Sequence, residues 1–336
     1  MNTIDYRLLN EFQRDLPLCT APYEKMGRVL GIDQASVIAA LKRLRQNGKV
    51  SRVGAVFRPN TVSSSTLAAM LVPEQRLEEV AALVTACPSV SHNYSRIYRW
   101  NLWFVASARD EKRLAQVLDS IEADSGCPVM RLPLVETYHI DLGFDLGFDD
   151  GRTPADDAPA RRVATTRHAT STPTLSETEA ALAAQLTSGL ALTPRPFAEL
   201  AARAGTSESA AIDTISRWVL DGVITRFGVI VRHHELGYTS NAMVAFDVPD
   251  CQATEAGLRL AAFPEVTLCA QRVRCLPDWP YNIYCMIHGR DDQRVLAQID
   301  TLRNRGGLLD YPFAVLFSRR RFKQQAARIA NEVAYG

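Results

Sequence analysis

The sequence predicts an α+β protein in which one unit of two modules occurs twice in tandem. Three observations predict this class: an internal repeat, helical spacing of apolar residues at the start of each copy, and alternating strand patterns in the remainder. The 336 residues are enough for several domains, each with its own core. A content of 47% hydrophobic and 22% charged residues is typical of a globular protein.

The repeat is visible at nearly constant offsets. A shift of 174 places Arg52-Val53-Gly54 on Arg226-Phe227-Gly228, and a shift of 176 places Arg96 on Arg272. Asn101 meets Asn282 only at a shift of 181, because the second copy has gained five residues (LPDWP) between these points. The same fold is therefore expected twice in the chain, with an insertion in the second copy.

Each copy divides into the same two modules. The first predicts three helices, over 4–12, 23–30 and 34–45, and a strand over 50–57; Gly31 ends the second helix and Asp33 caps the third. This order is typical of a winged helix-turn-helix. The order β-α-β-β-α-β of a ferredoxin-like domain follows, over these segments: 66–71, 76–85, 90–98, 101–108, 110–124 and 129–140.

The predicted domains follow from this division. Residues 149–174 are rich in Pro, Ala, Thr, Ser and charge, which indicates a flexible linker between the copies. The expected boundaries are 1–60 and 175–234 for the helical modules, and 61–148 and 235–336 for the ferredoxin-like modules.

Composition excludes several classes of protein. Lys+Arg 38 against Asp+Glu 37 gives a net charge of +1, so no overall basic field attracts nucleic acid. No apolar run approaches the ~20 residues that span a bilayer. Seven cysteines without a CxxC pair indicate reduced thiols, a cytoplasmic location and no intrinsic metal site.

The middle hairpin of each ferredoxin-like module is unusually polar. The first copy, SHNYSRIYRWNLWFV, carries His92 and Arg96 among aromatic residues, and the second carries Arg272, Arg274, Tyr281 and Asn282. Arginine, histidine and aromatic side chains on one sheet suit a flat, anionic and partly apolar ligand. In the second copy RFGVIVRHHELGY adds another polar cluster in a loop leading to the sheet: Arg226, Arg232, His233 and His234.

A winged helix followed by a ferredoxin-like domain resembles the AsnC/Lrp architecture of leucine-responsive regulators, over nearly all of both copies. That resemblance leaves two functions open: a DNA-binding transcriptional regulator, with or without heme as its ligand, and an enzyme on the same scaffold. The first expected recognition helix ends in Lys42, Arg43 and Arg45, whereas its counterpart, 207–220, has Glu208, Asp213 and only Arg217. We therefore favour a scaffold role for the helical modules and regard DNA as an unlikely partner.

Longer motifs sharpen the resemblance. SHNYSRIYRWNLWFV and RLPLVETYHIDLGFDL resemble the D-type subunit of siroheme decarboxylases, and RFGVIVRHHELGYTSNAMVAFDVPD with RVRCLPDWPYNIYCMIHG resembles the L-type subunit. The sequence is thus similar to a fused D–L (NirD–NirL) protein of heme d1 biosynthesis. The resemblance implies removal of CO2 from the C12 and C18 acetates of siroheme, giving 12,18-didecarboxysiroheme, with no cofactor beyond the substrate's iron. It also implies pairing of the two halves with each other; whether the chain forms a homodimer stays open.

Candidate site residues follow from the chemistry of that substrate. Guanidinium groups bind carboxylates in pairs of hydrogen bonds, and histidine titrates in the range needed to donate a proton as CO2 leaves. We expect His92, His233 and His234 to be catalytic. The expected substrate-binding residues are Arg96, Arg226, Arg232, Arg272, Arg274, Tyr281, Asn282 and His288.

The copies differ from each other and from the family pattern. The family hairpin often has a histidine where Tyr98 stands, and the second copy replaces the S-H-x-Y opening with Leu268, Cys269 and Ala270. Two alternatives stay open: one active site or two, and a histidine that donates the proton or one that ligates the substrate iron.

Overall fold

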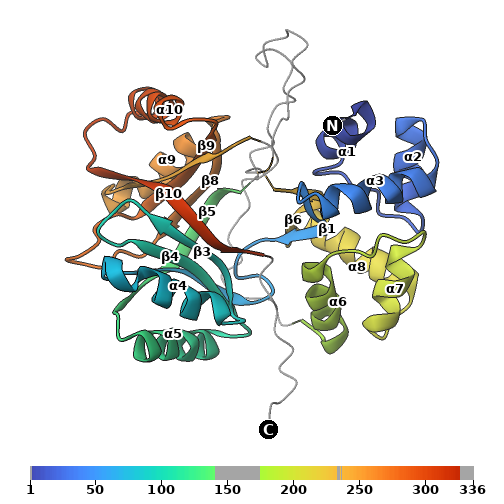
Figure 1. Ribbon diagram of the computed structural model, residues 1–336, viewed down its shortest axis with the longest axis horizontal. Coiled ribbons are helices and arrows are strands. Elements are labelled where there is room, and N and C mark those ends of the chain that lie inside the picture. The colour runs from blue at the N-terminus through green and yellow to red at the C-terminus, as the bar shows by residue number, and fades with distance from the viewer. Residues whose placement is uncertain (1, 141–174, 233–234, 236, 326–336) are drawn as a thin grey trace.

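The computed structural model describes residues 2–140, 175–232, 235 and 237–325. The chain forms two lobes, a helical lobe and a β-barrel lobe, and each copy contributes to both (Figure 1). The expected linker over 149–174 lies outside the described residues, and so do His233 and His234. Within the described ranges, no helix is both long and apolar enough to cross a bilayer.

The helical lobe is one unit built from both copies. Its elements are α1 (Thr3–Glu11), α2 (Pro22–Leu30), α3 (Gln34–Gln46) and β1 (Val50–Phe57), then α6 (Glu177–Ser188), α7 (Pro196–Arg203), α8 (Glu208–Leu220) and β6 (Ile224–Val231). Strands β1 and β6 pair antiparallel with each other, so each copy supplies one strand of a shared ribbon. A single hydrophobic core joins residues of both copies, from Leu8 and Tyr23 to Phe197 and Trp218.

Local features of this lobe follow the sequence. Asp33 accepts a hydrogen bond from the backbone of Ser36 at the start of α3, and Gly31 is left-handed (φ 72°) at the end of α2, as predicted. Gly228 of β6 packs against the segment that follows α1. A Cβ at this position would lie 2.3 Å from the carbonyl oxygen of Gln13. Only glycine permits that approach.

The barrel lobe contains two ferredoxin-like units. Its strands are β2 (Ser64–Met70), β3 (Val90–Arg96), β4 (Leu102–Ala108), β5 (Val129–Ile140), β7 (Ser240–Phe246), β8 (Val266–Arg272), β9 (Ile283–Gly289) and β10 (Phe313–Gln324). Its helices, which cover the outside, are η1 (Glu74–Arg76), α4 (Leu77–Ala86), α5 (Glu111–Ser125), α9 (Asp250–Ala261) and α10 (Asp292–Arg305). The strand orders β3-β4-β2-β5 and β8-β9-β7-β10 are those of the ferredoxin-like fold, so the predicted fold class is confirmed.

The two sheets close into one eight-stranded barrel. The 12-residue strand β10 pairs first with β7 of its own copy and then with β3 of the other, and β5 pairs in the same way with β2 and then β8. The sequence predicts that the two halves pair with each other, and the inner faces of their sheets do share a core that includes Trp103, Trp279 and Tyr284. Backbone hydrogen bonds between the edge strands, β10 with β3 and β5 with β8, join the two sheets as well.

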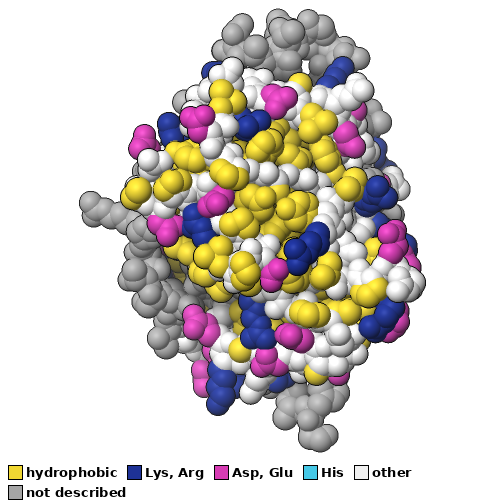
Figure 2. All heavy atoms as spheres, turned by 90° about the vertical axis from the view of Figure 1, so that its left-hand side faces the viewer, with side chains coloured by type: hydrophobic (Ala, Val, Ile, Leu, Met, Phe, Trp, Pro, Cys, Tyr) yellow, Lys and Arg dark blue, Asp and Glu magenta, His cyan; other side chains and the backbone are white. Residues whose placement is uncertain are grey.

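The two ends of the barrel differ in chemistry. Both hairpin turns lie at the end away from the helical lobe and carry exposed apolar side chains, among them Ile97, Val273 and Leu276. Figure 2 views the molecule from that side and shows apolar side chains gathered near the centre of the face. Strands β3 and β8 begin at the other end, which faces β1 and β6, so any polar site on these strand starts faces the helical lobe.

Candidate active site

Strand β3 presents a row of flat polar side chains to the inside of the barrel. Asn93 donates to the carbonyl oxygen of Ala81 in α4, on the outside, so the alternate residues His92, Tyr94 and Arg96 face inward. The rings of His92 and Tyr94 are stacked at 6.3 Å, and the Arg96 guanidinium lies 5.9 Å from the centre of the Tyr94 ring. This row suits a flat ligand with acidic side chains.

Strand β10 completes a polar surface beside this row. Arg321 lies opposite Tyr94, and Gln324 lies opposite His92. A small cavity of about 50 Å³ opens here, between β3, β10 and the start of β7. Its lining residues are Tyr94, Thr239, Asn241, Ser318, Arg319, Arg320, Arg321 and Gln324. We call this surface, together with His92, the polar seam.

The polar seam is linked to the loop that contains the predicted histidines. The Arg321 guanidinium donates to Oε1 of Gln324 at 3.1 Å and to Oε1 of Glu235 at 3.3 Å. Glu235 follows directly after His233 and His234, which themselves lie outside the described residues. Arg319 forms an ion pair with none of the described residues, so its charge is open to an anion.

Burial controls the charges on this seam. Burial lowers the pKa of His92 to about 4, and the nearby Arg52 guanidinium of β1 lowers it further. His92 is therefore neutral at neutral pH, with Nδ1 2.9 Å from the hydroxyl oxygen of Ser91. Burial also raises the pKa of Tyr94, which keeps its hydroxyl protonated and able to donate a hydrogen bond.

The other seam of the barrel has the same backbone and different side chains. Strands β8 and β5 pair there as β3 and β10 do, with Leu268 and Ala270 in the places of His92 and Tyr94. Thr137 takes the place of Arg321, and Ile140 that of Gln324. We call this surface, Leu268, Ala270, Thr137 and Ile140, the apolar seam.

Arg96 and Arg272 occupy equivalent positions in the two copies, Arg96 buried and Arg272 partly buried. Nη1 of Arg96 donates to the carbonyl oxygen of Leu316 at 2.8 Å, and Nη1 of Arg272 donates to that of Leu132 at 2.9 Å. Burial lowers the pKa of each arginine to about 10. Neither forms an ion pair with a described carboxylate, so among the described residues these two positive charges have no counter-charge.

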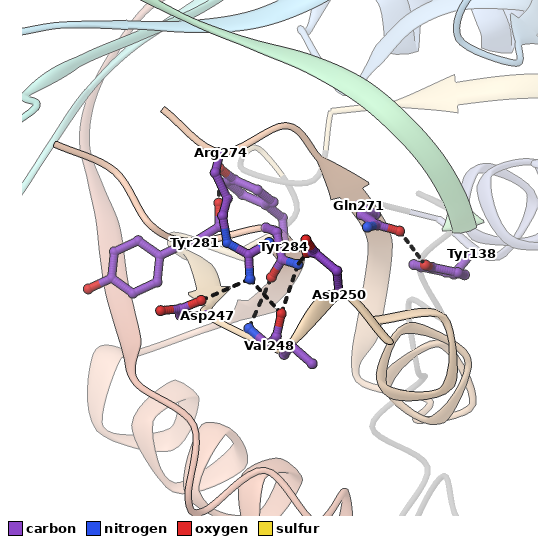
Figure 3. A network of polar contacts seen from close by, with 9 residues as sticks. Tyr138, Asp247, Val248, Asp250, Gln271, Arg274, Tyr281 and Tyr284 are labelled. Carbon is purple, nitrogen blue, oxygen red and sulfur yellow. Dashed lines mark hydrogen bonds and ion pairs between the residues drawn. The ribbon is translucent and has the colours of Figure 1, made fainter. Parts of the chain in front are cut away.

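Three other predicted ligand-binding residues lie together at the far end of the barrel (Figure 3). Arg274 forms ion pairs with Asp247 and Asp250 and donates to the carbonyl oxygen of Val248. Asn282 is fully buried; it accepts from the Val248 N–H and donates to the Val248 carbonyl, each at 3.0 Å. The Tyr281 ring lies 4.8 Å from that of Trp279, and burial raises the pKa of Tyr281 to about 12. These residues hold the loop after β7.

The remaining predicted residues separate between the lobes. His288 follows the inward-facing Tyr284 and Met286 on β9, lies opposite Asn241 of the polar seam, and has Nδ1 2.9 Å from Oγ1 of Thr267. Arg226 is buried in the helical lobe opposite Val56. The backbone N–H of Arg232 donates to the carbonyl oxygen of Lys49. The structure thus places His92 and His288 near the polar seam and leaves Arg226 in the helical lobe.

Sequence reasoning missed several residues of the polar seam. Arg319, Arg321 and Asn241 lie on strands that were treated as scaffold. A signal for them was present, since an offset of 184 places Arg319-Arg320-Arg321 on Val135-Glu136-Thr137. Three consecutive arginines whose three counterparts in the repeat include one acid and no base indicate a function confined to one copy.

Comparisons with known proteins agree with this architecture. A model of the siroheme decarboxylase NirDL-like HTH domain matches residues 5–50 and 179–224, and a model of the AsnC-like ligand binding domain matches 62–139 and 235–323. A siroheme decarboxylase NirDL subunit of Paracoccus denitrificans is 45% identical over 99% of both chains. The chain belongs to the siroheme decarboxylase NirDL family. The predicted class of enzyme, a carboxy-lyase, follows from this membership.

Solved NirDL structures have the same overall fold. A crystal structure of the siroheme decarboxylase NirDL matches with a TM-score of 0.69 at 26% identity, covering 98% of this chain and 95% of that one. A second, in complex with an iron-uroporphyrin III analogue, matches with a TM-score of 0.67 at 25% identity, covering 97% and 93%. The family resemblance seen in the sequence is therefore confirmed.

Proposed function

We propose that this chain removes CO2 from the acetate side chains at C12 and C18 of siroheme, giving 12,18-didecarboxysiroheme in heme d1 biosynthesis. In each step the bond between the acetate CH2 and its carboxylate breaks, and CO2 departs. The electron pair stays on the CH2 carbon and its ring, and one proton converts CH2 to CH3. The reaction needs no oxidant, and the iron enters with the substrate.

The observation that carries the proposal is a whole-chain relative named siroheme decarboxylase, 45% identical over 99% of both chains. The barrel supports it independently. Arg96 is buried and Arg272 partly buried, neither with a described carboxylate partner, and a buried charge is costly unless an opposite charge or hydrogen bonds compensate it. An iron tetrapyrrole with several carboxylates supplies such charges, and a family member has been solved with one of this kind.

Histidine is the proposed source of the proton. The candidates are His92 on the polar seam, and His233 and His234 just before Glu235. His92 is neutral without ligand, because burial and Arg52 lower its pKa to about 4. A substrate carboxylate next to the imidazole raises that pKa, so substrate binding itself loads the proton that the product needs.

Binding is assigned to groups that face the barrel interior. Arg96 and Arg272 provide positive charge, and His288 lies beside the polar seam through Asn241. Arg274, Tyr281 and Asn282 are assigned to holding the loop after β7 and not to contact with substrate. Arg226 lies buried in β6 of the helical lobe, and Arg232 directly follows that strand.

We infer that the helical lobe positions the barrel and does not recognise an operator. In α3, Arg43 forms an ion pair with Asp5, and in α8, Arg217 pairs with Glu179. Glu208 at the start of α8 pairs with Arg195. Specific recognition by two equivalent helices requires similar cationic surfaces on both, and these helices differ.

Anaerobic incubation with siroheme tests the proposal. Mass spectrometry should show two successive losses of CO2 with the wild-type protein. His233→Ala and His234→Ala should each lower the rate at least about 10²-fold, the usual scale of general acid catalysis, while circular dichroism stays unchanged. Full activity in both variants would remove these two histidines from the mechanism. A wild-type protein that binds siroheme without loss of CO2 would contradict the function itself.

A further inference from the structure

The two seams are equivalent in backbone and unequal in chemistry. Register pairs Arg321 with Tyr94 on one side of the barrel and Thr137 with Ala270 on the other. We propose that only the polar seam binds a reacting carboxylate, through Arg319, Arg321 and Tyr94, and that both acetates of the substrate are removed there in succession. This inference rests on the proposed function.

The polar seam offers a carboxylate several donors at once. Arg319 forms an ion pair with no described residue, and the contact of Arg321 with Glu235 is long, at 3.3 Å. The Tyr94 hydroxyl stays protonated, because burial raises its pKa. The cavity of about 50 Å³ that these groups line has room for one or two water-sized groups, which is the size of a carboxylate arm and not of a macrocycle.

The apolar seam offers almost none of this. Leu268 and Ile140 stand where His92 and Gln324 stand on the other side. Val135 and Glu136 replace Arg319 and Arg320, so a negative charge stands here in place of two positive ones. A carboxylate placed there loses its hydration and meets no cation at the positions of Arg319 and Arg321, which is unfavourable.

If only the polar seam binds a reacting carboxylate, the two losses of CO2 must occur one after the other. The carboxylates at C12 and C18 cannot both lie in a cavity of carboxylate size. The singly decarboxylated tetrapyrrole therefore leaves or turns before the second CO2 is lost, and the same residues serve both steps. Removing one of these residues must slow both losses alike.

A matched set of variants tests this. Arg321→Thr and Tyr94→Phe change the polar seam, and Thr137→Ala changes the equivalent position of the apolar seam. Single-turnover mass spectrometry with siroheme measures each CO2 loss separately. Arg321→Thr should slow the first and the second loss by about 10–100-fold each, the value of one charge-assisted hydrogen bond. Tyr94→Phe, which keeps the stacked ring, should slow both less, and Thr137→Ala should change neither by more than about twofold.

Binding stoichiometry gives an independent readout. Absorbance titration of the intact chain with an iron uroporphyrin should saturate at one equivalent, with Arg321→Thr weakened and Thr137→Ala unchanged. Two equivalents of similar affinity would overturn the inference, as would an Arg321→Thr variant that completes one loss at the wild-type rate and stops. Neither result touches the proposed function, which fails only if the wild-type protein releases no CO2.

Discussion

The two copies of the repeat share the contacts that build the barrel and differ in the residues that can bind a ligand. Arg96 and Arg272 make the same hydrogen bond to the last strand of the opposite copy. The Asn101 side chain forms hydrogen bonds with both the N–H and the carbonyl of Val72, and Asn282 does the same with Val248. His92, Tyr94 and Arg321, in contrast, have no polar equivalent except Thr137. Comparison of copies within one chain thus separates residues that support the fold from residues that serve function.

A second difference lies at the far end of the barrel. The five residues gained by the second copy bring Trp279 into the core between the sheets, where it is completely buried. Its ring lies 5.2 Å from that of Trp103 and 5.4 Å from that of Tyr98, both from the first copy. The first copy has no counterpart. The insertion therefore fills the core at the far end of the barrel.

The largest expected effect comes from removing this side chain. Trp279→Ala should lower the free energy of unfolding by about 3–5 kcal/mol, because it leaves a cavity among four aromatic residues and removes the partner of the Tyr284 hydroxyl. Denaturant titration measures the change. Leu276→Ala, in the same insertion but 69% exposed, should cost under about 0.5 kcal/mol. Equal losses in the two variants would mean that the insertion matters as a whole and not through its tryptophan.

The two equivalent asparagines give the next effect. Asn282→Ala should cost about 3 kcal/mol, because the N–H and carbonyl of Val248 are left buried without a partner. Asn101→Ala should cost less, about 1–2 kcal/mol, since Asn101 is only half-buried, whereas Asn282 is fully buried. Decarboxylation per folded molecule should be unchanged in both. A loss of activity at full stability in Asn282→Ala would instead restore this residue to the substrate-binding set predicted from the sequence.

These residues show how far the sequence could predict the structure. The repeat and the two periodicities predict the fold class, because helix and strand spacing depend on neighbouring residues alone. The pairing of β10 with β3 could not be predicted, since it joins edges more than 200 residues apart along the chain and depends on the length of β10.

The candidate site was predictable only in part, for a related reason. Asn282 and Arg274 were selected as ligand-binding residues because they are polar and lie in an aromatic hairpin. The sequence does not show that Val248, Asp247 and Asp250 already occupy their hydrogen bonds. His92 was selected for the same polarity, and there the structure adds the stacking with Tyr94 and the neighbouring Arg321.

The smallest expected effect is a pH dependence that only the polar seam can produce. His92 has a pKa of about 4 in the folded protein, against an ordinary value of 6.5. Between these values the unfolded chain binds a proton at His92 that the folded protein does not, so the free energy of unfolding rises with pH across this window. The full shift corresponds to about 3 kcal/mol, and the partial exposure of His92 reduces this to about 1–2 kcal/mol.

A matched pair of variants isolates this contribution. His92→Leu gives the polar seam the residue that the apolar seam carries at Leu268, and it should flatten the rise in unfolding free energy between pH 4 and 6.5 by that amount. Leu268→Ala, at the equivalent position, should shift the whole curve without changing its slope, since alanine does not titrate. If the slope of the His92→Leu curve equals that of the wild type, His92 is protonated in the folded protein throughout this range. It could then donate a proton before substrate binds, and loading by the substrate carboxylate would be unnecessary.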